Sequence, residues 1–134
     1  GYAIARPMPA DAVPVWLRVL AGLAVLASFA ITLWASRVNT FMSARVRIQS
    51  ERGHRAISTG PYGIVRHPMY AAMCLLDMGL PLLLNSWWGL GVSALMIAAV
   101  VVRTVLEDAT LQRELPGYAE YARQVRFRLL PGVW

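Results

Sequence analysis

Lysine is absent from this sequence, and cysteine occurs once, at Cys74 inside an apolar run. A single thiol cannot form an internal disulfide, so the fold does not depend on an oxidising compartment. Cys74, His54 and His67 do not have the spacing of a zinc site, so we expect no metal ion. His54 lies in a polar loop, and we expect it to be a solvated surface residue.

Acidic residues are also scarce. The chain of 134 residues carries 7 Asp and Glu against 13 arginines, which gives a formal net charge of +6. No basic patch has the interleaved aromatic residues of a nucleic-acid surface, so we expect no nucleic-acid partner. An excess of arginine in an apolar chain instead indicates membrane topology and contact with anionic lipids.

Apolar residues are abundant, because 57% of the chain is hydrophobic and only 15% is charged. This composition is typical of an integral membrane protein. Residues 13–35 are almost wholly apolar and long enough to cross a bilayer once as a helix. Trp16 and Trp34 lie near the two ends of this segment, where indole rings prefer the membrane interface. Residues 13–35 are therefore the first predicted span.

A second apolar tract, residues 69–106, is too long for one crossing and suits two. Pro81 weakens a helix, and Asn85 offers turn and capping chemistry near the middle of the tract. The tract predicts a tight helical hairpin with spans near 69–84 and 87–106. The expected fold class is an all-α integral membrane bundle with about three transmembrane helices.

Positive charge sets the expected orientation, because basic segments stay on the cytoplasmic side of a membrane. The loop 36–68 and the C-terminal segment 107–134 are basic, whereas the hairpin tip carries no charge. Their arginines are Arg37, Arg45, Arg47, Arg52, Arg55, Arg66, Arg113, Arg123, Arg126 and Arg128. Residues 1–12 are then outside, and residues 107–130 form a short amphipathic helix and tail on the cytoplasmic surface. We expect one domain over 1–134 in a bacterial inner membrane, in contact with membrane lipids, either alone or as a homo-oligomer.

The hairpin brings two groups of polar residues to the same side of the membrane. Its first helix starts near Arg66, His67 and Tyr70, and its second helix ends near Arg103 and Glu107. Since the helices run antiparallel, these ends emerge at one depth. Arg103 and Glu107 are four residues apart, so they share a helix face and can pair or jointly line a pocket.

The tripeptide Arg66-His67-Pro68 stands at the junction between the basic loop and the hairpin. Pro68 suits the first turn of a helix, where its missing N–H costs nothing, and it keeps His67 out of helical geometry. We expect this junction to present the imidazole and free backbone groups to a cavity. For Arg66, a role as a topology signal is an equal alternative.

Three carboxylates stand where they are costly. Glu107 and Asp108 lie at the negative end of a helix dipole, which suggests that they hold a cation, either a neighbouring arginine or a ligand. Asp77 lies well inside the second span, roughly 14 Å deep at about 1.5 Å per residue. An ionisable group at that depth indicates a functional site. A hydrogen-bonded aspartic acid between helices is the equal alternative for Asp77.

Together these residues resemble a known family. The stretch GPYGIVRHPMY, followed about 35 residues later by RTVLEDATL, is similar to the isoprenylcysteine carboxyl methyltransferases and their phospholipid methyltransferase relatives. Those proteins are membrane enzymes that use S-adenosylmethionine. The positions that match the family pattern are Arg66, His67, Pro68, Tyr70, Arg103, Glu107, Asp108 and Leu111. The family usually has glutamate where this chain has Asp108. The tail YAEYARQVRFRLLP resembles the closing segment of the family, so the likeness covers roughly residues 55–131.

The resemblance implies an enzyme that transfers a methyl group from S-adenosylmethionine to a carboxylate, amine or thiol of a lipophilic acceptor. It implies catalytic roles for Arg103 and Glu107. The implied cofactor-binding residues are Tyr62, Arg66, His67, Pro68, Tyr70, Glu107, Asp108 and Tyr118. Asp77 and Arg103 are the expected substrate-binding residues.

Two other functions stay open at this point. A membrane reductase of the sterol-reductase type has a similar C-terminal hairpin and would use a nicotinamide cofactor. A non-catalytic membrane subunit, whose basic loop binds a partner or anionic lipid, would suit the short chain and the arginine-rich loop.

Overall fold

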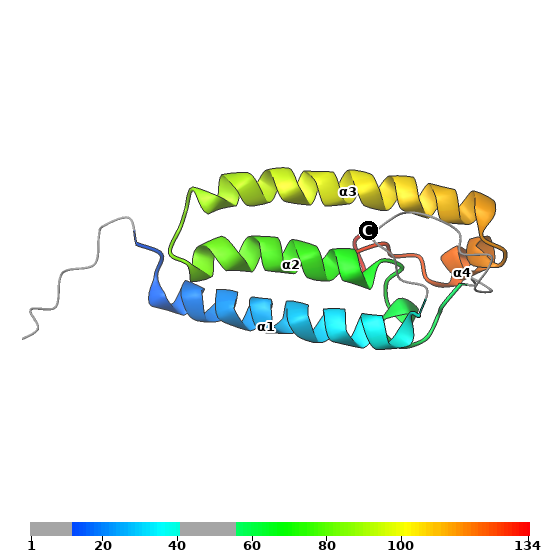
Figure 1. The fold of residues 1–134 in the computed structure, drawn as a ribbon, viewed down its shortest axis with the longest axis horizontal. Coiled ribbons are helices and arrows are strands. Elements are labelled where there is room, and N and C mark those ends of the chain that lie inside the picture. Colours follow the sequence, from blue (N-terminus) through cyan, green and yellow to red (C-terminus); the bar gives the residue numbers. More distant parts are fainter. Residues whose placement is uncertain (1–11, 41–55) are drawn as a thin grey trace, which may run out of the picture.

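The computed structural model describes residues 12–40 and 56–134 (Figure 1). Its elements are α1 (Val15–Val38), the short 3-10 helix η2 (Gly60–Gly63), α2 (Pro68–Leu83), α3 (Gly89–Glu114) and α4 (Tyr118–Gln124). These two ranges contain helices and no strand, which confirms the predicted all-α class. The predictions for Arg45, Arg47, Arg52, His54 and Arg55 lie outside the described residues.

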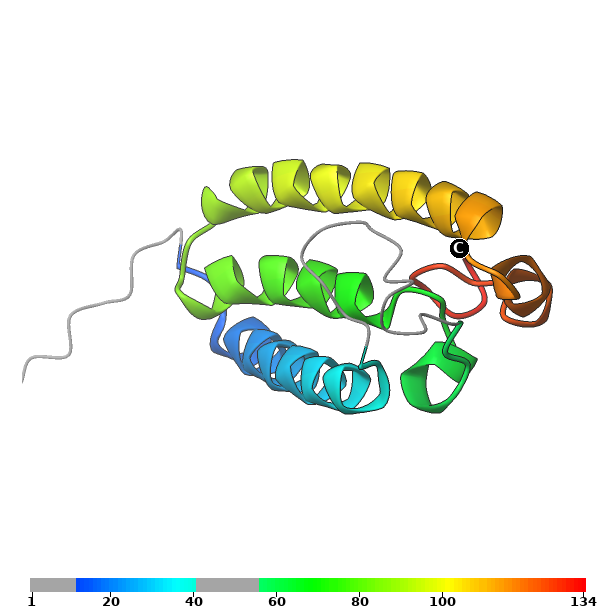
Figure 2. The same ribbon diagram turned by 45° about the vertical axis from the view of Figure 1, so that its right-hand side comes forward.

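The three long helices lie side by side, with α2 between α1 and α3 (Figures 1 and 2). Helix α2 packs against both neighbours, and a short connection joins it to α3. This is the antiparallel hairpin that the sequence predicts. The helices η2 and α4 lie at the end of the bundle away from the hairpin turn, where η2 contacts α1 and α4 contacts α3.

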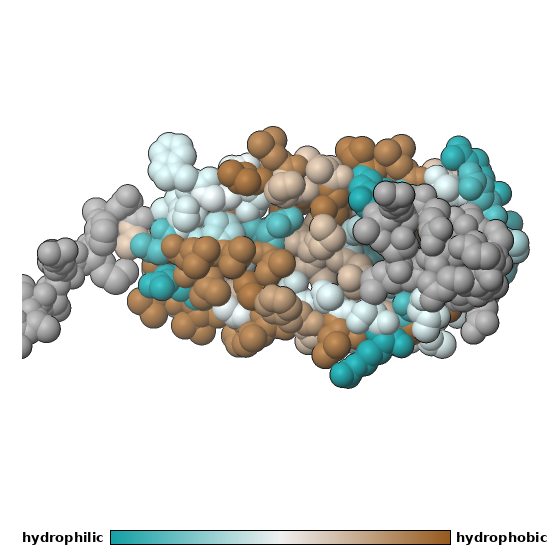
Figure 3. Space-filling model, in the orientation of Figure 1, coloured by the Kyte–Doolittle hydropathy of each residue, from teal (hydrophilic) through white to brown (hydrophobic). Residues whose placement is uncertain are grey.

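Helices α1 and α3 leave most of their apolar windows unburied, and Figure 3 shows apolar side chains over both helices on one face of the molecule. Trp16 and Leu26 of α1 are 64% and 66% exposed, and Leu95 of α3 is 72% exposed. A core helix of a soluble protein would bury such residues, whereas a helix in lipid leaves them facing outward. Both helices are long and apolar enough to cross a membrane, and α2 is an apolar helix of 16 residues. The third crossing stays a prediction.

The second helix of the hairpin is longer than predicted. Helix α3 does not end near residue 106 but continues to Glu114, so the predicted short helix and tail over 107–130 had the wrong boundary. The residues after 106 include good helix formers and no proline or glycine, so nothing stops the helix before Pro116. Glu107 and Asp108 are therefore fixed on a rigid helix rather than in a surface segment.

Small residues and hydroxyl groups hold α2 against its neighbours. A Cβ built on Gly79 would lie 3.0 Å from the carbonyl oxygen of Ala21, so the backbones of α1 and α2 approach closely there. The Ser28 hydroxyl of α1 donates to the Ala72 carbonyl of α2 at 2.8 Å. The Ser93 hydroxyl of α3 donates to the Asp77 carbonyl. Close small-residue contacts and interhelical hydrogen bonds are the means by which helices associate in lipid.

The main buried cluster lies at the end of the bundle that carries η2 and α4. Its members are Ala35, Tyr62, Leu115, Tyr118 and Tyr121, each less than 10% exposed. They come from α1, η2, α4 and the residue that follows α3, so this cluster ties four segments together. It fixes the position of the ionic groups described next.

Candidate functional site

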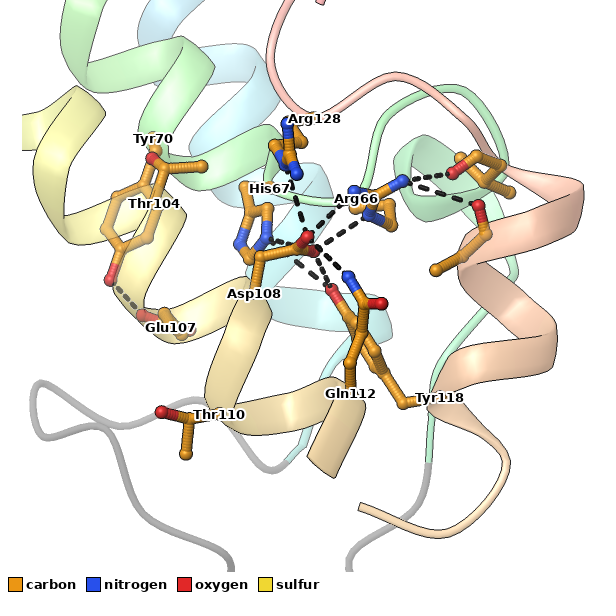
Figure 4. Close-up of polar contacts among 12 residues, drawn as sticks. Arg66, His67, Tyr70, Thr104, Glu107, Asp108, Thr110, Gln112, Tyr118 and Arg128 are labelled. Carbon is orange, nitrogen blue, oxygen red and sulfur yellow. Dashed lines mark hydrogen bonds and ion pairs between the residues drawn. The ribbon is translucent and has the colours of Figure 1, made fainter. Parts of the chain in front are cut away.

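Asp108 is the centre of a dense polar cluster at this end of the bundle (Figure 4). The side chain is 1% exposed. Arg66 donates two parallel hydrogen bonds to the Asp108 carboxylate, from Nε to Oδ1 and from Nη2 to Oδ2, both at 2.8 Å. Such a bidentate pair is among the stronger hydrogen-bonding arrangements in proteins.

Four more side chains contact the same carboxylate. On Oδ1, the Tyr118 hydroxyl donates at 2.9 Å and Nε2 of His67 lies at 3.1 Å. On Oδ2, Gln112 donates from Nε2 at 2.9 Å and Arg128 donates from Nε at 3.1 Å. We call these six residues the Asp108 hub: Arg66, His67, Asp108, Gln112, Tyr118 and Arg128.

The hub joins four parts of the chain that are distant in sequence. Helix α3 supplies Asp108 and Gln112, one turn apart, and the junction before α2 supplies Arg66 and His67. Tyr118 comes from the start of α4. Arg128 comes from residues 125–134, which follow α4 and which we call the tail. The predicted convergence of the two ends of the hairpin is confirmed. The cation that Asp108 holds in this structure is supplied by neighbouring arginines.

Arg66 also fastens the tail through its other terminal nitrogen. Nη1 donates to the carbonyl oxygens of Val125 at 2.9 Å and Arg126 at 3.0 Å, and a longer contact of 3.4 Å reaches that of Ala122. The side chain is only 5% exposed, so it does not extend to the membrane surface as a topology anchor would. Arg66 therefore has a structural role that its position in the sequence did not reveal.

The backbone of the junction is paired with the tail as well. The N–H of Arg66 donates to the Phe127 carbonyl, and the N–H of His67 donates to the Arg128 carbonyl, both at 2.9 Å. The expectation that the junction presents free backbone N–H groups to a cavity is therefore wrong. The tail folds back along the junction, and its carbonyl groups accept from both of these N–H groups. The local sequence of the junction does not predict this pairing.

Burial and the charge of Asp108 together set the pKa values of Tyr118 and Arg66. Burial, followed by the charge of Asp108 and the hydrogen bond to it, raises the pKa of Tyr118 well above the ordinary value of 10.0. Burial alone would lower the pKa of Arg66, but the hydrogen bond and charge of Asp108 raise it overall. At neutral pH the phenol is thus a hydrogen-bond donor and the guanidinium is charged.

A second polar group lies beside the hub and is more accessible. Nε of Arg103 donates to the Tyr70 hydroxyl at 2.6 Å, and that hydroxyl donates to Oε2 of Glu107. The guanidinium carbon of Arg103 lies 5.7 Å from the centre of the Tyr70 ring. We call Tyr70, Arg103 and Glu107 the Tyr70 group. Arg103 and Glu107 do share a face of α3, as predicted, and the Tyr70 hydroxyl joins them.

His67 is the hub residue that contacts the Tyr70 group. Its ring is stacked on that of Tyr70, with the ring centres 5.8 Å apart and an angle of 18° between the planes. One ring nitrogen faces Asp108, and the other points away from it (Figure 4). Pro68 follows in the first turn of α2, as predicted. His67 is therefore the physical connection between the two groups.

Tyr62 and Asp77 belong to neither the hub nor the Tyr70 group. Tyr62 packs in the buried cluster, where its hydroxyl accepts from Asn39 at 3.2 Å and its carbonyl accepts from the Tyr121 hydroxyl at 2.6 Å. Burial raises the pKa of Tyr62. Asp77 lies seven residues after Tyr70, on the same face of α2 and about two helical turns away. No contact tests the predicted ligand roles of Tyr62 and Asp77, which stay predictions.

Sequence reasoning missed two members of the hub. Gln112 had a signal, because it lies four residues after Asp108 and therefore on the same helix face. Arg128 belongs to the tail that resembles the closing segment of the family, but the sequence does not give its partner. Among residues 12–40 and 56–134, no three His, Cys, Asp or Glu side chains are placed to hold a metal ion.

The apolar helices and the ionic cluster at one end of them define a membrane protein whose polar site stands at the edge of the apolar region. Comparison with known families matches residues 16–116 to the phospholipid methyltransferase family. The chain belongs to this family. The family description names methyltransferases, which agrees with the resemblance seen in the hairpin residues.

One relative shows a likeness over part of the chain. The cobalt-zinc-cadmium resistance protein CzcN of Cupriavidus metallidurans is 35% identical over 80 residues. The match covers 58% of this chain and 36% of the relative. The chain thus corresponds to well under half of that protein's length.

Proposed function

We propose that this chain transfers a methyl group from S-adenosylmethionine to a lipophilic acceptor. Family membership supports methyl transfer, and the exposed apolar faces of α1 and α3 support an acceptor that arrives through the bilayer. The observation that carries the proposal is the Tyr70 group. It combines an accessible carboxylate, an arginine and a neighbouring histidine at the end of apolar helices.

The side chains of the Tyr70 group suit the polar groups of the cofactor. S-adenosylmethionine carries a sulfonium cation, an ammonium group and ribose hydroxyls, all of which favour a carboxylate partner. Glu107 is partly exposed, and one of its oxygens accepts from Tyr70. We assign the ammonium or ribose hydroxyls to Glu107 and the nucleoside to His67 with the neighbouring segment around Tyr62. When bound, the cofactor supplies a methyl group on a positively charged sulfur.

The protein's own contribution is mainly positioning and exclusion of water. A methyl transfer to a carboxylate needs no proton transfer, so correct alignment carries most of the rate. Arg103 is exposed at the edge of α3, and its bond to the Tyr70 hydroxyl fixes its direction. We assign Arg103 the steering of an anionic acceptor group. For an amine acceptor, Glu107 or His67 would take the proton.

The polar end of the bundle is the side on which we place the cytoplasm. Arg113, Arg123 and Arg126 are exposed there, whereas residues 84–88 at the hairpin turn carry no charge. Basic segments stay on the cytoplasmic side, which supports a bacterial inner-membrane protein with its site facing the cytoplasm. Asp77 would contact the acceptor deeper between α2 and α3.

Calorimetric titration of the detergent-purified protein with S-adenosylmethionine and S-adenosylhomocysteine tests this function. We expect saturable binding that Glu107→Gln weakens about 10- to 100-fold, because a charge-assisted hydrogen bond is worth about 1.5–3 kcal/mol. Glutamine can still accept from Tyr70, so the variant should stay folded. Glu120→Gln is the matched control, because this exposed carboxylate pairs with Arg123 and Gln124 of the same helix α4. Absence of binding by a folded wild-type protein would refute the proposal.

A further inference from the structure

Asp108 and Glu107 are neighbours in sequence with opposite surroundings. Both Asp108 oxygens are engaged, since five side chains make six contacts with them. A carboxylate offers about four lone-pair positions, so Asp108 has no capacity left for a ligand. Glu107 is partly exposed and accepts from Tyr70. The pair of acids is thus divided into a saturated member and an accessible one.

We propose that Asp108 is a positioning residue, which holds the C-terminal tail on the junction before α2 and fixes the His67 ring, and that of the two adjacent acids only Glu107 contacts the cofactor. The part concerning Glu107 rests on the proposed function. The part concerning the tail and His67 rests on the hub and is independent of any ligand.

The tail is held through two arginines that share this carboxylate. Arg66 binds Asp108 with one edge of its guanidinium and the tail carbonyls with the other. Arg128 reaches Asp108 from the tail itself, and its guanidinium carbon lies 5.1 Å from the centre of the Trp134 ring. Because both arginines are oriented by the same two oxygens, loss of the Asp108 charge should release both sides of the connection together.

The His67 ring is fixed from two directions. A deprotonated carboxylate only accepts hydrogen bonds, so the 3.1 Å contact requires the proton on Nε2 of His67. The neutral ring then presents Nδ1 as an acceptor on the side away from Asp108 (Figure 4). Stacking on Tyr70 fixes the plane of the ring. Asp108 thus sets which nitrogen of His67 can accept a hydrogen bond.

Two measurements on the ligand-free full chain test the positioning role. In amide hydrogen exchange, Asp108→Asn should speed exchange at Arg66 and His67, whose N–H groups bind the tail, by at least about tenfold. Asp108→Glu, which restores the carboxylate, should return exchange toward the wild-type rate. Tyr118→Phe removes one donor to the hub and should give a smaller increase. Tyr121→Phe is the matched control, because that hydroxyl binds the Tyr62 carbonyl instead.

The tautomer is read by nitrogen NMR of histidine-labelled protein that carries His54→Gln, so that His67 is the single labelled histidine. We expect the Nε2–H form in the neutral ring. The Nδ1–H form would overturn the assignment for His67.

Cofactor titration of the same variants separates this inference from the proposed function. If Asp108→Asn loses S-adenosylmethionine binding while exchange at the junction is unchanged, Asp108 is a direct ligand and the inference fails. If the wild type binds no cofactor but Asp108→Asn still releases the junction, the proposed function fails and the positioning role stands.

Discussion

The two ends of the helical bundle are held together by different means. At the hairpin end, two hydrogen bonds tie α1 and the segment before it to the end of α2 and the turn: Asn85 Oδ1 accepts from the Val13 N–H at 2.7 Å, and Nε of Arg18 donates to the Leu83 carbonyl at 3.4 Å. At the opposite end, the Asp108 carboxylate contacts the side chains of two arginines, a histidine, a tyrosine and a glutamine. The two contacts at the hairpin end link residues 72 and 65 positions apart, and each is a single hydrogen bond to an uncharged oxygen. Side-chain contacts at the hub end link residues up to 60 positions apart and centre on buried ion pairs to Asp108, so the two ends differ in the kind of contact and not in its sequence separation.

The largest expected loss of stability comes from breaking the buried ion pair between Arg66 and Asp108 at the hub end. Arg66→Gln should lower the free energy of unfolding by about 3–5 kcal/mol, because it leaves a buried carboxylate without its main partner. Thermal or denaturant unfolding in detergent measures this loss. Arg123→Gln is the control, since it breaks an exposed pair with Glu120 at 3.0 Å and should cost less than about 1 kcal/mol. Equal losses in the two variants would show that the hub adds no stability.

A bulky residue at the contact between α1 and α2 should have the next largest effect. Gly79→Leu should cost about 1–3 kcal/mol, because a Cβ there already lies 3.0 Å from the Ala21 carbonyl oxygen and from Val25. Gly91→Leu is the matched control on α3, where a Cβ meets nothing within 4 Å. Unfolding of both variants in the same detergent gives the difference. An unchanged Gly79→Leu protein would mean that α1 and α2 are less closely packed than described.

At the hairpin end, Asn85 combines a side-chain bond with an unusual backbone. Its φ is 61°, a left-handed conformation that alanine adopts at a cost of about 1–2 kcal/mol. Asn85→Ala should therefore lower stability by about 1–2 kcal/mol, with cofactor affinity unchanged because the Tyr70 group is at the other end of the bundle. Asn85→Gly keeps the conformation accessible and should lose less. A change in cofactor affinity in either variant would break the separation between the two ends.

Alkaline pH should affect the hub end, with no change below about pH 10. The pKa of Tyr118 is raised above its unfolded value of 10.0, so the protonated phenol is the form that the fold stabilises. The stability that it contributes is fully present below pH 10 and falls as the pH rises toward the folded pKa. Tyrosinate absorbance and unfolding measured from pH 8 upward give this profile. Tyr118→Phe should flatten it, and an unaltered profile in that variant would exclude Tyr118 as the titrating group.

The hairpin and its consequences were predictable from the sequence for a clear physical reason. An apolar tract too long for one crossing and interrupted near Asn85 has to turn back, so its two ends meet. This places Arg66 and His67 beside Glu107 and Asp108 without any further information. The end of α3 was predicted eight residues too early, because hydropathy falls after residue 106 while the helix continues to Glu114.

The different surroundings of Glu107 and Asp108 were not predictable from the sequence. In the sequence, Glu107 and Asp108 are adjacent carboxylates on one polar turn. In the structure, one helical step of about 100° turns Asp108 inward to the hub and leaves Glu107 beside Tyr70 at the accessible surface. The direction in which each acid points depends on where α4 and the tail pack, and those contacts are long-range.

The sequence by itself determined the class of structure, the hairpin, the polar end and the family, because apolar length, turn residues and spacing along a helix are local properties. Only the tertiary structure decided that the tail closes on the junction before α2, that Asp108 is saturated by protein groups, and that the Tyr70 hydroxyl joins Arg103 to Glu107. These features depend on which side chains meet after α3, α4 and the tail have folded back on one another. A buried charge can stay charged only where such partners are supplied, and the partners of Asp108 come from four separate parts of the chain.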